Sequence, residues 1–110
     1  MEIKYKIWLE DNGKVIFGKG RKELFLAIDE CQSLKGAAEK LNMSYRAAWG
    51  RLKASEERLG KKIVDVDPLR RGMQLTDEAR ALLRDYDKLE KDIEHLLARD
   101  RGKLSSLSQK

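Results

Sequence analysis

Residues 37–59, AAEKLNMSYRAAWGRLKASEERL, decide the fold of this chain. Two helical patterns meet at Asn42, and Asn tolerates the left-handed backbone that a sharp corner requires. Ser44 follows as a predicted N-cap, because its hydroxyl can accept a hydrogen bond from a free amide of the next helix. A helix, a tight corner and a second capped helix indicate a helix-turn-helix, whose second helix enters the DNA major groove.

The second helix of this pair has two distinct faces. Spacings of three and four place one set of residues toward a core, namely Ala48, Leu52, Ser55 and Leu59. The opposite, outer face carries Arg46, Gly50, Lys53 and Glu57. Gly60 is expected to end this helix, and Ser33 to cap the first helix of the pair.

The residues before the pair predict a β-hairpin followed by a helix. Apolar and polar side chains alternate over residues 3–9, which is typical of a half-buried strand. Asn12-Gly13 is a favoured two-residue hairpin turn, so residues 15–17 are expected to return as the second strand. A helix is expected over residues 21–31, with its inner stripe formed by Leu24, Ala27, Ile28 and Cys31.

The segment after the second helix has the pattern of a β-wing. Residues 63–66 and 73–75 indicate two short strands around a loop bounded by Pro68 and Gly72. The loop carries Arg70 and Arg71. Arginine suits the negative potential of a minor groove, and a merely solubilising turn is the alternative interpretation.

A long helix is expected over residues 77–101, with Thr76 as its cap. Its apolar residues recur at alternating spacings of three and four, as in a heptad seam: Ala79, Leu82, Tyr86, Leu89, Ile93 and Leu96. Because so small a domain leaves little to cover this helix, we expect a second copy to pack on the seam. The alternative is the core-facing stripe of an ordinary helix.

With 110 residues, the chain is long enough for one domain with a modest core. The expected fold over residues 1–101 is mainly α with small β, a winged helix-turn-helix with an N-terminal β-hairpin and a long C-terminal dimerisation helix. Its parts are the hairpin (1–18), the helical DNA-reading region (21–60), the wing (61–76) and the dimerisation helix (77–101). The Ser-rich, basic residues 102–110 are expected to form a flexible tail.

Charge is distributed unevenly along the chain. Residues 1–76 hold 16 Lys and Arg against 11 Asp and Glu, whereas residues 77–101 hold 6 against 8. The basic excess therefore lies over the predicted reading region and favours an anionic partner. The slightly acidic last helix is better suited to contact with protein.

Other classes of function find little support. Cys31 is the one cysteine, which excludes an internal disulfide and favours a reducing cytoplasm. The N-terminus lacks the apolar run of a signal peptide, and no stretch approaches the roughly 20 apolar residues of a membrane helix. No phosphate loop, metal-ligand spacing or activated nucleophile appears, and His95 stands alone. We expect no catalysis, cofactor, metal or membrane partner.

Three stretches together resemble the winged helix-turn-helix shared by LysR-type regulators and by ModE, the molybdate-responsive regulator. They are AAEKLNMSYRAAW, LKASEERLGKKIVDVD and RRGMQLTDEA. Residues 44–49, SYRAAW, are similar to the Ser-Tyr-Lys-Ser-Ala-Trp run of the ModE type, and the resemblance covers residues 24–97. It implies a DNA-binding transcriptional regulator that dimerises through its terminal helices. The chain ends before a molybdate-binding module begins, so we expect no molybdate site in it.

Candidate DNA contacts follow from position on the second helix. Arg46 can donate two hydrogen bonds to guanine, which discriminates against other bases by about 1–3 kcal/mol. Ser44 and Tyr45 suit phosphate or thymine-methyl contacts. Gly50 either lets the DNA backbone approach closely or is a neutral change at an exposed position. The candidate phosphate contacts are Lys19, Arg21, Lys35, Arg51 and Lys53.

Trp49 borders the outer face of the same helix. Its indole can stack on a sugar or contact a thymine methyl. We expect it instead to pack against the hairpin or the helix before the pair, because buried aromatic area dominates small cores.

The sequence thus predicts a cytoplasmic, sequence-specific DNA-binding transcriptional regulator that acts as a homodimer on double-stranded DNA. A first alternative is a protein–protein interaction module, in which the seam binds a different protein. A second is a sequence-independent architectural DNA binder. A regulator should prefer one site by about 10³-fold or more over random duplex, which separates these classes.

Overall fold

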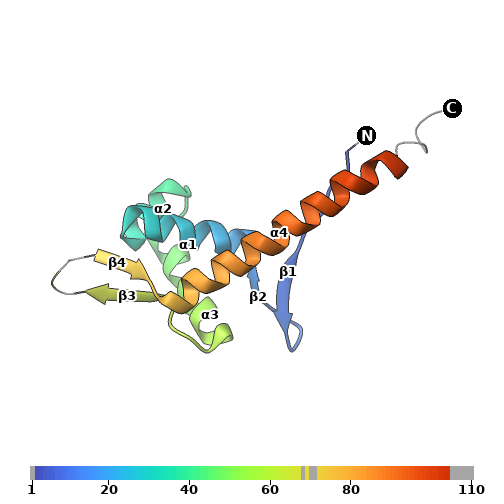
Figure 1. Cartoon of the computed structure of the whole chain (residues 1–110). Coiled ribbons are helices and arrows are strands. Elements are labelled where there is room, and N and C mark those ends of the chain that lie inside the picture. The colour runs from blue at the N-terminus through green and yellow to red at the C-terminus, as the bar shows by residue number, and fades with distance from the viewer. Residues whose placement is uncertain (1, 68, 70–71, 105–110) are drawn as a thin grey trace.

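The computed structural model describes residues 2–67, 69 and 72–104. Its elements are β1 (Trp8–Asp11), β2 (Lys14–Gly18), α1 (Lys19–Cys31), α2 (Leu34–Lys40), α3 (Tyr45–Leu59), β3 (Val64–Asp67), β4 (Gly72–Leu75) and α4 (Asp77–Leu104). Two antiparallel hairpins, β1–β2 and β3–β4, flank three short helices, and α4 crosses the domain and projects beyond it (Figure 1). The predicted fold, a mainly α winged helix-turn-helix with an N-terminal hairpin and a long last helix, is confirmed.

One aromatic cluster ties the parts of the domain together. Phe17 of β2 is fully buried, and its ring centroid lies 5.4 Å from that of Phe25 in α1. The Phe17 and Tyr86 centroids are 4.9 Å apart with the rings nearly perpendicular, which is a favoured edge-to-face arrangement. Because Tyr86 belongs to α4, this cluster joins the hairpin, the first helix and the last helix.

The predicted inner stripes are largely confirmed. Leu24, Ala27 and Ile28 of α1 are buried, whereas Cys31 is only half-buried. Phe25 was missed, although it is fully buried. It lies beside the stripe because β2 covers α1 from a second side, which widens the buried face.

The β1–β2 turn is confirmed, but the predicted strand over residues 3–9 is wrong at its start. Asn12 and Gly13 have positive φ, at 50° and 77°. Pairing ends where Trp8 faces Gly18, because the chain turns into α1 immediately after Gly18. Residues before Trp8 therefore have no strand to pair with.

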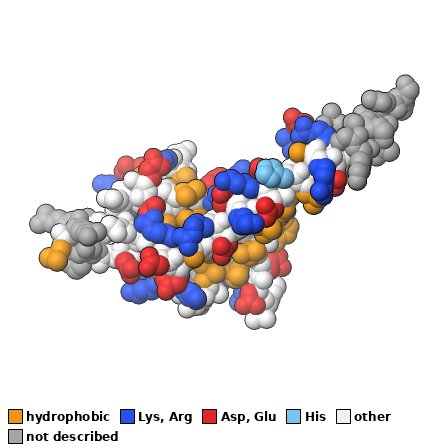
Figure 2. Space-filling model, in the orientation of Figure 1, with side chains coloured by type: hydrophobic (Ala, Val, Ile, Leu, Met, Phe, Trp, Pro, Cys, Tyr) orange, Lys and Arg blue, Asp and Glu red, His pale blue; other side chains and the backbone are white. Residues whose placement is uncertain are grey.

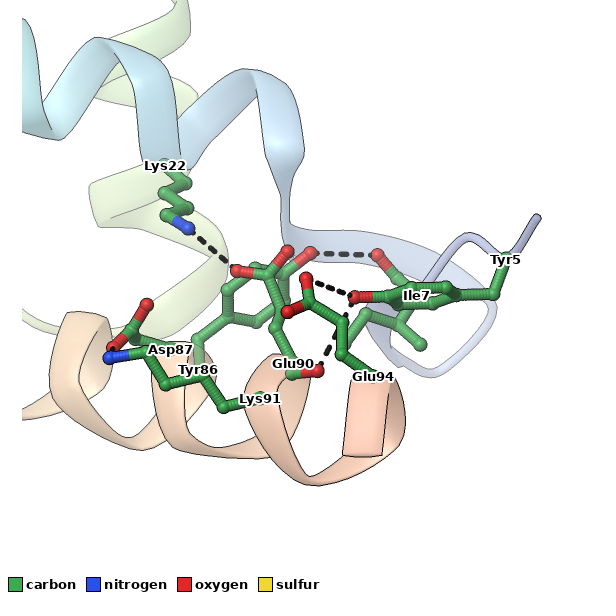
Figure 3. Close-up of polar contacts among 8 residues, drawn as sticks. All are labelled: Tyr5, Ile7, Lys22, Tyr86, Asp87, Glu90, Lys91 and Glu94. Carbon is green, nitrogen blue, oxygen red and sulfur yellow. Dashed lines mark hydrogen bonds and ion pairs between the residues drawn. The ribbon is translucent and has the colours of Figure 1, made fainter. Parts of the chain in front are cut away.

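Within the N-terminal arm, residues 2–7, Tyr5 and Ile7 instead contact α4 (Figure 3). The Tyr5 hydroxyl donates to Glu94 Oε1 at 3.0 Å and approaches the Glu90 carbonyl at 3.3 Å. The Tyr86 hydroxyl donates to the Ile7 carbonyl at 2.8 Å. Desolvation and the bond to Glu94 raise the pKa of Tyr5 to about 12, so this hydroxyl remains a donor near neutral pH. The alternation before Trp8 thus reflects the contacts of Tyr5 and Ile7 with a helix.

Two ion pairs fix α4 against α1. Lys22 Nζ lies 2.6 Å from Glu90 Oε1 (Figure 3), and Arg80 binds both carboxylate oxygens of Asp29, at 2.8 and 3.1 Å. A paired guanidinium and carboxylate also restrict orientation, because both groups are planar. The helix that carries the predicted seam therefore has a defined direction relative to the domain.

The predicted seam is divided by this packing. Ala79 and Tyr86, which we assigned to a dimer interface, are buried inside the subunit, so that assignment is wrong for them. Leu82 is partly buried against the same core. Farther along, Leu89 and Leu96 are 43% and 44% exposed.

The predicted helix end is also corrected. α4 continues to Leu104, beyond the predicted end at residue 101, and its 28 residues span about 42 Å. The rest of the predicted tail, residues 105–110, lies outside the described residues.

Phe17→Ala should lower the free energy of unfolding by about 3–5 kcal/mol, because it empties the centre of the aromatic cluster. Urea unfolding followed by circular dichroism measures this. The control Leu26→Ala removes a side chain that is 47% exposed, and should change stability by no more than about 0.5 kcal/mol. Equal losses in the two variants would contradict the central role of Phe17.

Candidate nucleic-acid interface

The corner that orients α3 is built from local backbone contacts. Asn42 has φ 56°, as predicted, and the Met43 amide donates to the Ala38 carbonyl at 2.9 Å. The Ser44 hydroxyl accepts from the Ala47 amide at 3.0 Å, and the Ser33 hydroxyl caps α2 in the same way. Both predicted N-caps are therefore confirmed.

The two faces of α3 are also confirmed. Ala48, Leu52 and Ser55 are buried, and Leu59 is half-buried. The residues of the outer face are all exposed: Arg46, Gly50, Lys53 and Glu57. A Cβ built on Gly50 meets nothing within 4 Å, so this surface is open beside it. We call this face, with Ser44 at its start, the reading face.

The expectation that Trp49 packs against the hairpin or α1 is wrong. Its side chain is 49% exposed, and Lys53 Nζ lies 5.8 Å from the ring centroid. Tyr45, in the first turn of α3, is also exposed. The core is already filled by Phe17, Phe25 and Tyr86, which leaves both aromatic side chains at the edge of the reading face.

A buried serine joins α3 to α1. The Ser55 hydroxyl donates to the Arg51 carbonyl at 2.8 Å and accepts from Arg21 Nε at 3.0 Å. Burial lowers the pKa of Arg21, and the nearby charges of Arg58 and Arg51 lower it further. Arg21, a predicted phosphate contact, is thus also a structural link that the sequence pattern did not reveal.

The wing is anchored to both neighbouring helices. The Ile63 amide donates to Glu56 Oε2 at 3.0 Å, and the Met73 amide donates to the Gln32 carbonyl at 2.9 Å. The Thr76 hydroxyl accepts from the Ala79 amide at 3.2 Å, which confirms it as the cap of α4. β3 begins one residue later than predicted, at Val64. The predictions for Pro68, Arg70 and Arg71 fall outside the described residues.

The remaining cationic candidates lie at the surface. Lys19, Lys35 and Arg51 are exposed, and Lys53 Nζ lies 3.3 Å from Glu56 Oε1. On the side of the molecule seen in Figure 2, Lys, Arg, Asp and Glu side chains are intermingled along α4. The surface of α4 on this side therefore has no continuous patch of positive or negative charge.

The described residues offer neither a metal site nor a membrane-spanning helix. No group of three or more His, Cys, Asp or Glu among them could hold a metal ion, and His95 is exposed. No helix in the same part of the chain is both long and apolar enough to cross a bilayer.

An exposed, capped second helix, a tight corner and a following wing define a winged helix-turn-helix DNA-binding domain. The chain belongs to the LysR family of bacterial regulatory helix-turn-helix proteins, whose family model matches residues 21–80. By class it is a bacterial regulatory helix-turn-helix protein.

Solved structures agree on the fold. The CbnR DNA-binding domain in complex with DNA has a TM-score of 0.57 at 24% identity, covering 80% of this chain and 98% of that one. The BenM DNA-binding domain with benA site 1 DNA has a TM-score of 0.59 at 22% identity, covering 78% and 94%. Oxidised OxyR of Corynebacterium glutamicum has a TM-score of 0.55 at 25% identity over 73% of this chain. The chain covers 25% of the length of that OxyR. No curated protein matches the chain.

Ser44→Ala should cost about 1 kcal/mol of stability, because the Ala47 amide loses its acceptor. Thermal or urea unfolding measures the loss. Ser44→Asp retains an acceptor at the positive end of α3 and should unfold close to wild type. Equal destabilisation by both substitutions would contradict the capping role.

Proposed function

We propose that this chain is a sequence-specific transcription regulator that binds double-stranded DNA as a homodimer. The observation that carries the proposal is the reading face of α3, which is exposed along its length while the opposite face is buried. A rigid, capped helix with one open face has the form that enters a major groove. Specificity in this mode comes from side chains that reach base edges.

In this proposal Arg46 reads a base, because it is exposed in the first turn of α3 and a guanidinium pairs with guanine through two hydrogen bonds. Tyr45 and Trp49 present exposed rings at the edge of the same face, suited to thymine methyls or sugars. Lys35, Arg51 and Lys53 supply phosphate contacts. Arg70 and Arg71 are proposed, from the sequence, to contact the backbone or the minor groove.

The proposed dimer forms through the outer half of α4. Leu89 and Leu96 are exposed there, with the half-buried Ile93 between them at heptad spacing. This part of the helix projects beyond the domain (Figure 1), where another chain can reach it. Two reading faces related by a twofold axis imply a roughly palindromic site.

The finer family assignment is also a proposal. Residues 44–49 favour the ModE type within this fold class, by the resemblance of SYRAAW to that family's motif. A regulator of bacterial DNA would work in the cytoplasm. We propose no molybdate site and no cofactor in this chain.

Selection from random duplex DNA tests the function directly. A regulator should enrich one site, bound about 10³-fold or more tightly than random duplex. An architectural protein would enrich none while still binding. A protein–protein interaction module would bind no duplex even at low salt. Either of the last two results would reject the proposed function.

With the selected site, Arg46→Ala should relax preference at one base position by about 1–3 kcal/mol. Lys53→Ala, on the same face, should weaken all duplexes alike and lower the log–log salt slope by about 0.9. Fluorescence anisotropy over single-base variants of the site measures both. Unchanged base preference in Arg46→Ala would show that this arginine is not the reader.

Leu89→Asp should convert the dimer into monomers, because it places a charge in the apolar seam. Sedimentation equilibrium gives the mass. His95→Asp makes a similar charge change at an exposed position off the seam and should leave the dimer intact. An unchanged dimer mass for Leu89→Asp would reject this interface, and a wild-type monomer would reject the homodimer.

A further inference from the structure

A groove of about 700 Å³ lies between the β1–β2 hairpin, the start of α1 and the flank of α3. Its walls carry Lys6 of the N-terminal arm, Lys19 and Arg21 of α1, and Arg51 of α3, with Trp8 beside them. Glu23 is the acidic residue in the lining. Cations from three separate parts of the chain therefore meet at one concave surface.

These cations lack carboxylate partners among the described residues. No ion pair in that part of the chain involves Lys6, Lys19, Arg21 or Arg51. Elsewhere, by contrast, Lys22 pairs with Glu90. Four cations outnumber the one carboxylate of Glu23 in this lining and repel one another, and a bound anion would relieve that repulsion.

The backbone at the start of α1 adds to the same field. Gly18 occupies the N-cap position of this helix and has no side chain that could accept from the first amides. The first turn also holds no acidic residue. The start of α1, with its free amides and the positive end of the helix dipole, therefore lies at the groove, whose lining includes Gly18, Lys19 and Gly20. A Cβ built on Gly20 meets nothing within 4 Å, so the approach to this backbone is open.

The groove reaches α3 at Arg51, beside the reading face. Arg51 follows Gly50 directly, and successive helix residues are about 100° apart around the axis. Arg51 thus lies on the flank of α3, between the reading face and the buried face. The groove continues from Arg51 on that same side of α3.

We propose that this groove holds the phosphate backbone of the DNA segment that flanks the bases read by α3. Lys6, Lys19 and Arg51 are exposed and spread over three elements, which suits a polyanionic strand better than a small anion enclosed on all sides. The proposal rests on the proposed function. It adds the hairpin edge, which lies outside the helix-turn-helix, to the DNA-contacting surface.

The test is the double substitution Lys6→Gln with Lys19→Gln, which spares the structural link between Arg21 and Ser55. Binding to a mixed-sequence duplex of about 30 base pairs is measured by anisotropy across salt concentrations. The log–log salt slope should fall by about 0.9 for each phosphate that the variant no longer neutralises, and affinity near 0.1 M salt should fall roughly tenfold. Melting temperature confirms that the variant is folded.

The matched control is Lys88→Gln with Lys91→Gln, which removes the same charge from the exposed surface of α4. Its slope should stay close to wild type. If wild type binds but the groove variant keeps the wild-type slope and affinity, the groove proposal is overturned while the proposed function stands. An equal loss in the control would also overturn it, as a general effect of net charge. No duplex binding by wild type would reject both.

Trp8 provides an independent readout. In a Trp49→Phe background it is the remaining indole of the two in the chain, and it is about half exposed in the groove wall. DNA seated in the groove should reduce acrylamide quenching of Trp8 fluorescence. Unchanged quenching at saturating duplex would contradict the proposal even if affinity had changed.

Discussion

The packing of Phe17 between Phe25 and Tyr86 is the interaction on which the rest of the structure depends. It joins the hairpin, α1 and α4 in one apolar centre, and the domain is too small to offer a second core. Once these three elements are fixed, α2 and α3 are supported by buried Ala37, Ala38, Ala48 and Leu52. The reading face is open because the opposite face of α3 is required for this packing.

The same constraint directs the long helix. Tyr86 is the apolar anchor of α4, and its hydroxyl, bonded to the Ile7 carbonyl, holds the N-terminal arm. Arg80 and Glu90, on either side of that anchor, form ion pairs with Asp29 and Lys22 of α1. If two chains pair through the outer half of α4, this rigid attachment sets the separation and direction of the two reading faces.

Charge and packing divide the molecule between two kinds of partner. Cations without ion-pair partners gather where the hairpin, α1 and α3 meet. The surface of α4 mixes both signs (Figure 2), and its outer half carries the exposed Leu89 and Leu96. A polyanion is attracted to the first surface and gains little at the second. A protein surface with a matching seam fits the second. The proposed DNA contact and the proposed dimer contact therefore both follow from one uneven distribution of side chains.

The local geometry was determined by the sequence itself. Caps at Ser33, Ser44 and Thr76, the turn at Asn12-Gly13 and the corner at Asn42 were all predictable, because each depends on neighbouring backbone and one short side chain. The amphipathic faces of α1 and α3 were predictable for the same reason, since helical spacing alone places their residues.

Only the tertiary structure decided which of several apolar segments are buried in the core and which remain exposed. The arm lies on α4 because β2 ends at Gly18, and Trp49 is displaced to the surface because other aromatic residues fill the core. The predicted seam of α4 is divided into a buried and an exposed part, because the first half of the helix covers that core. Gln32 has φ 55° although Gln rarely adopts it, and its carbonyl accepts a hydrogen bond from the Met73 amide of the wing. Such outcomes depend on residues distant in sequence, which periodicity and propensity do not encode.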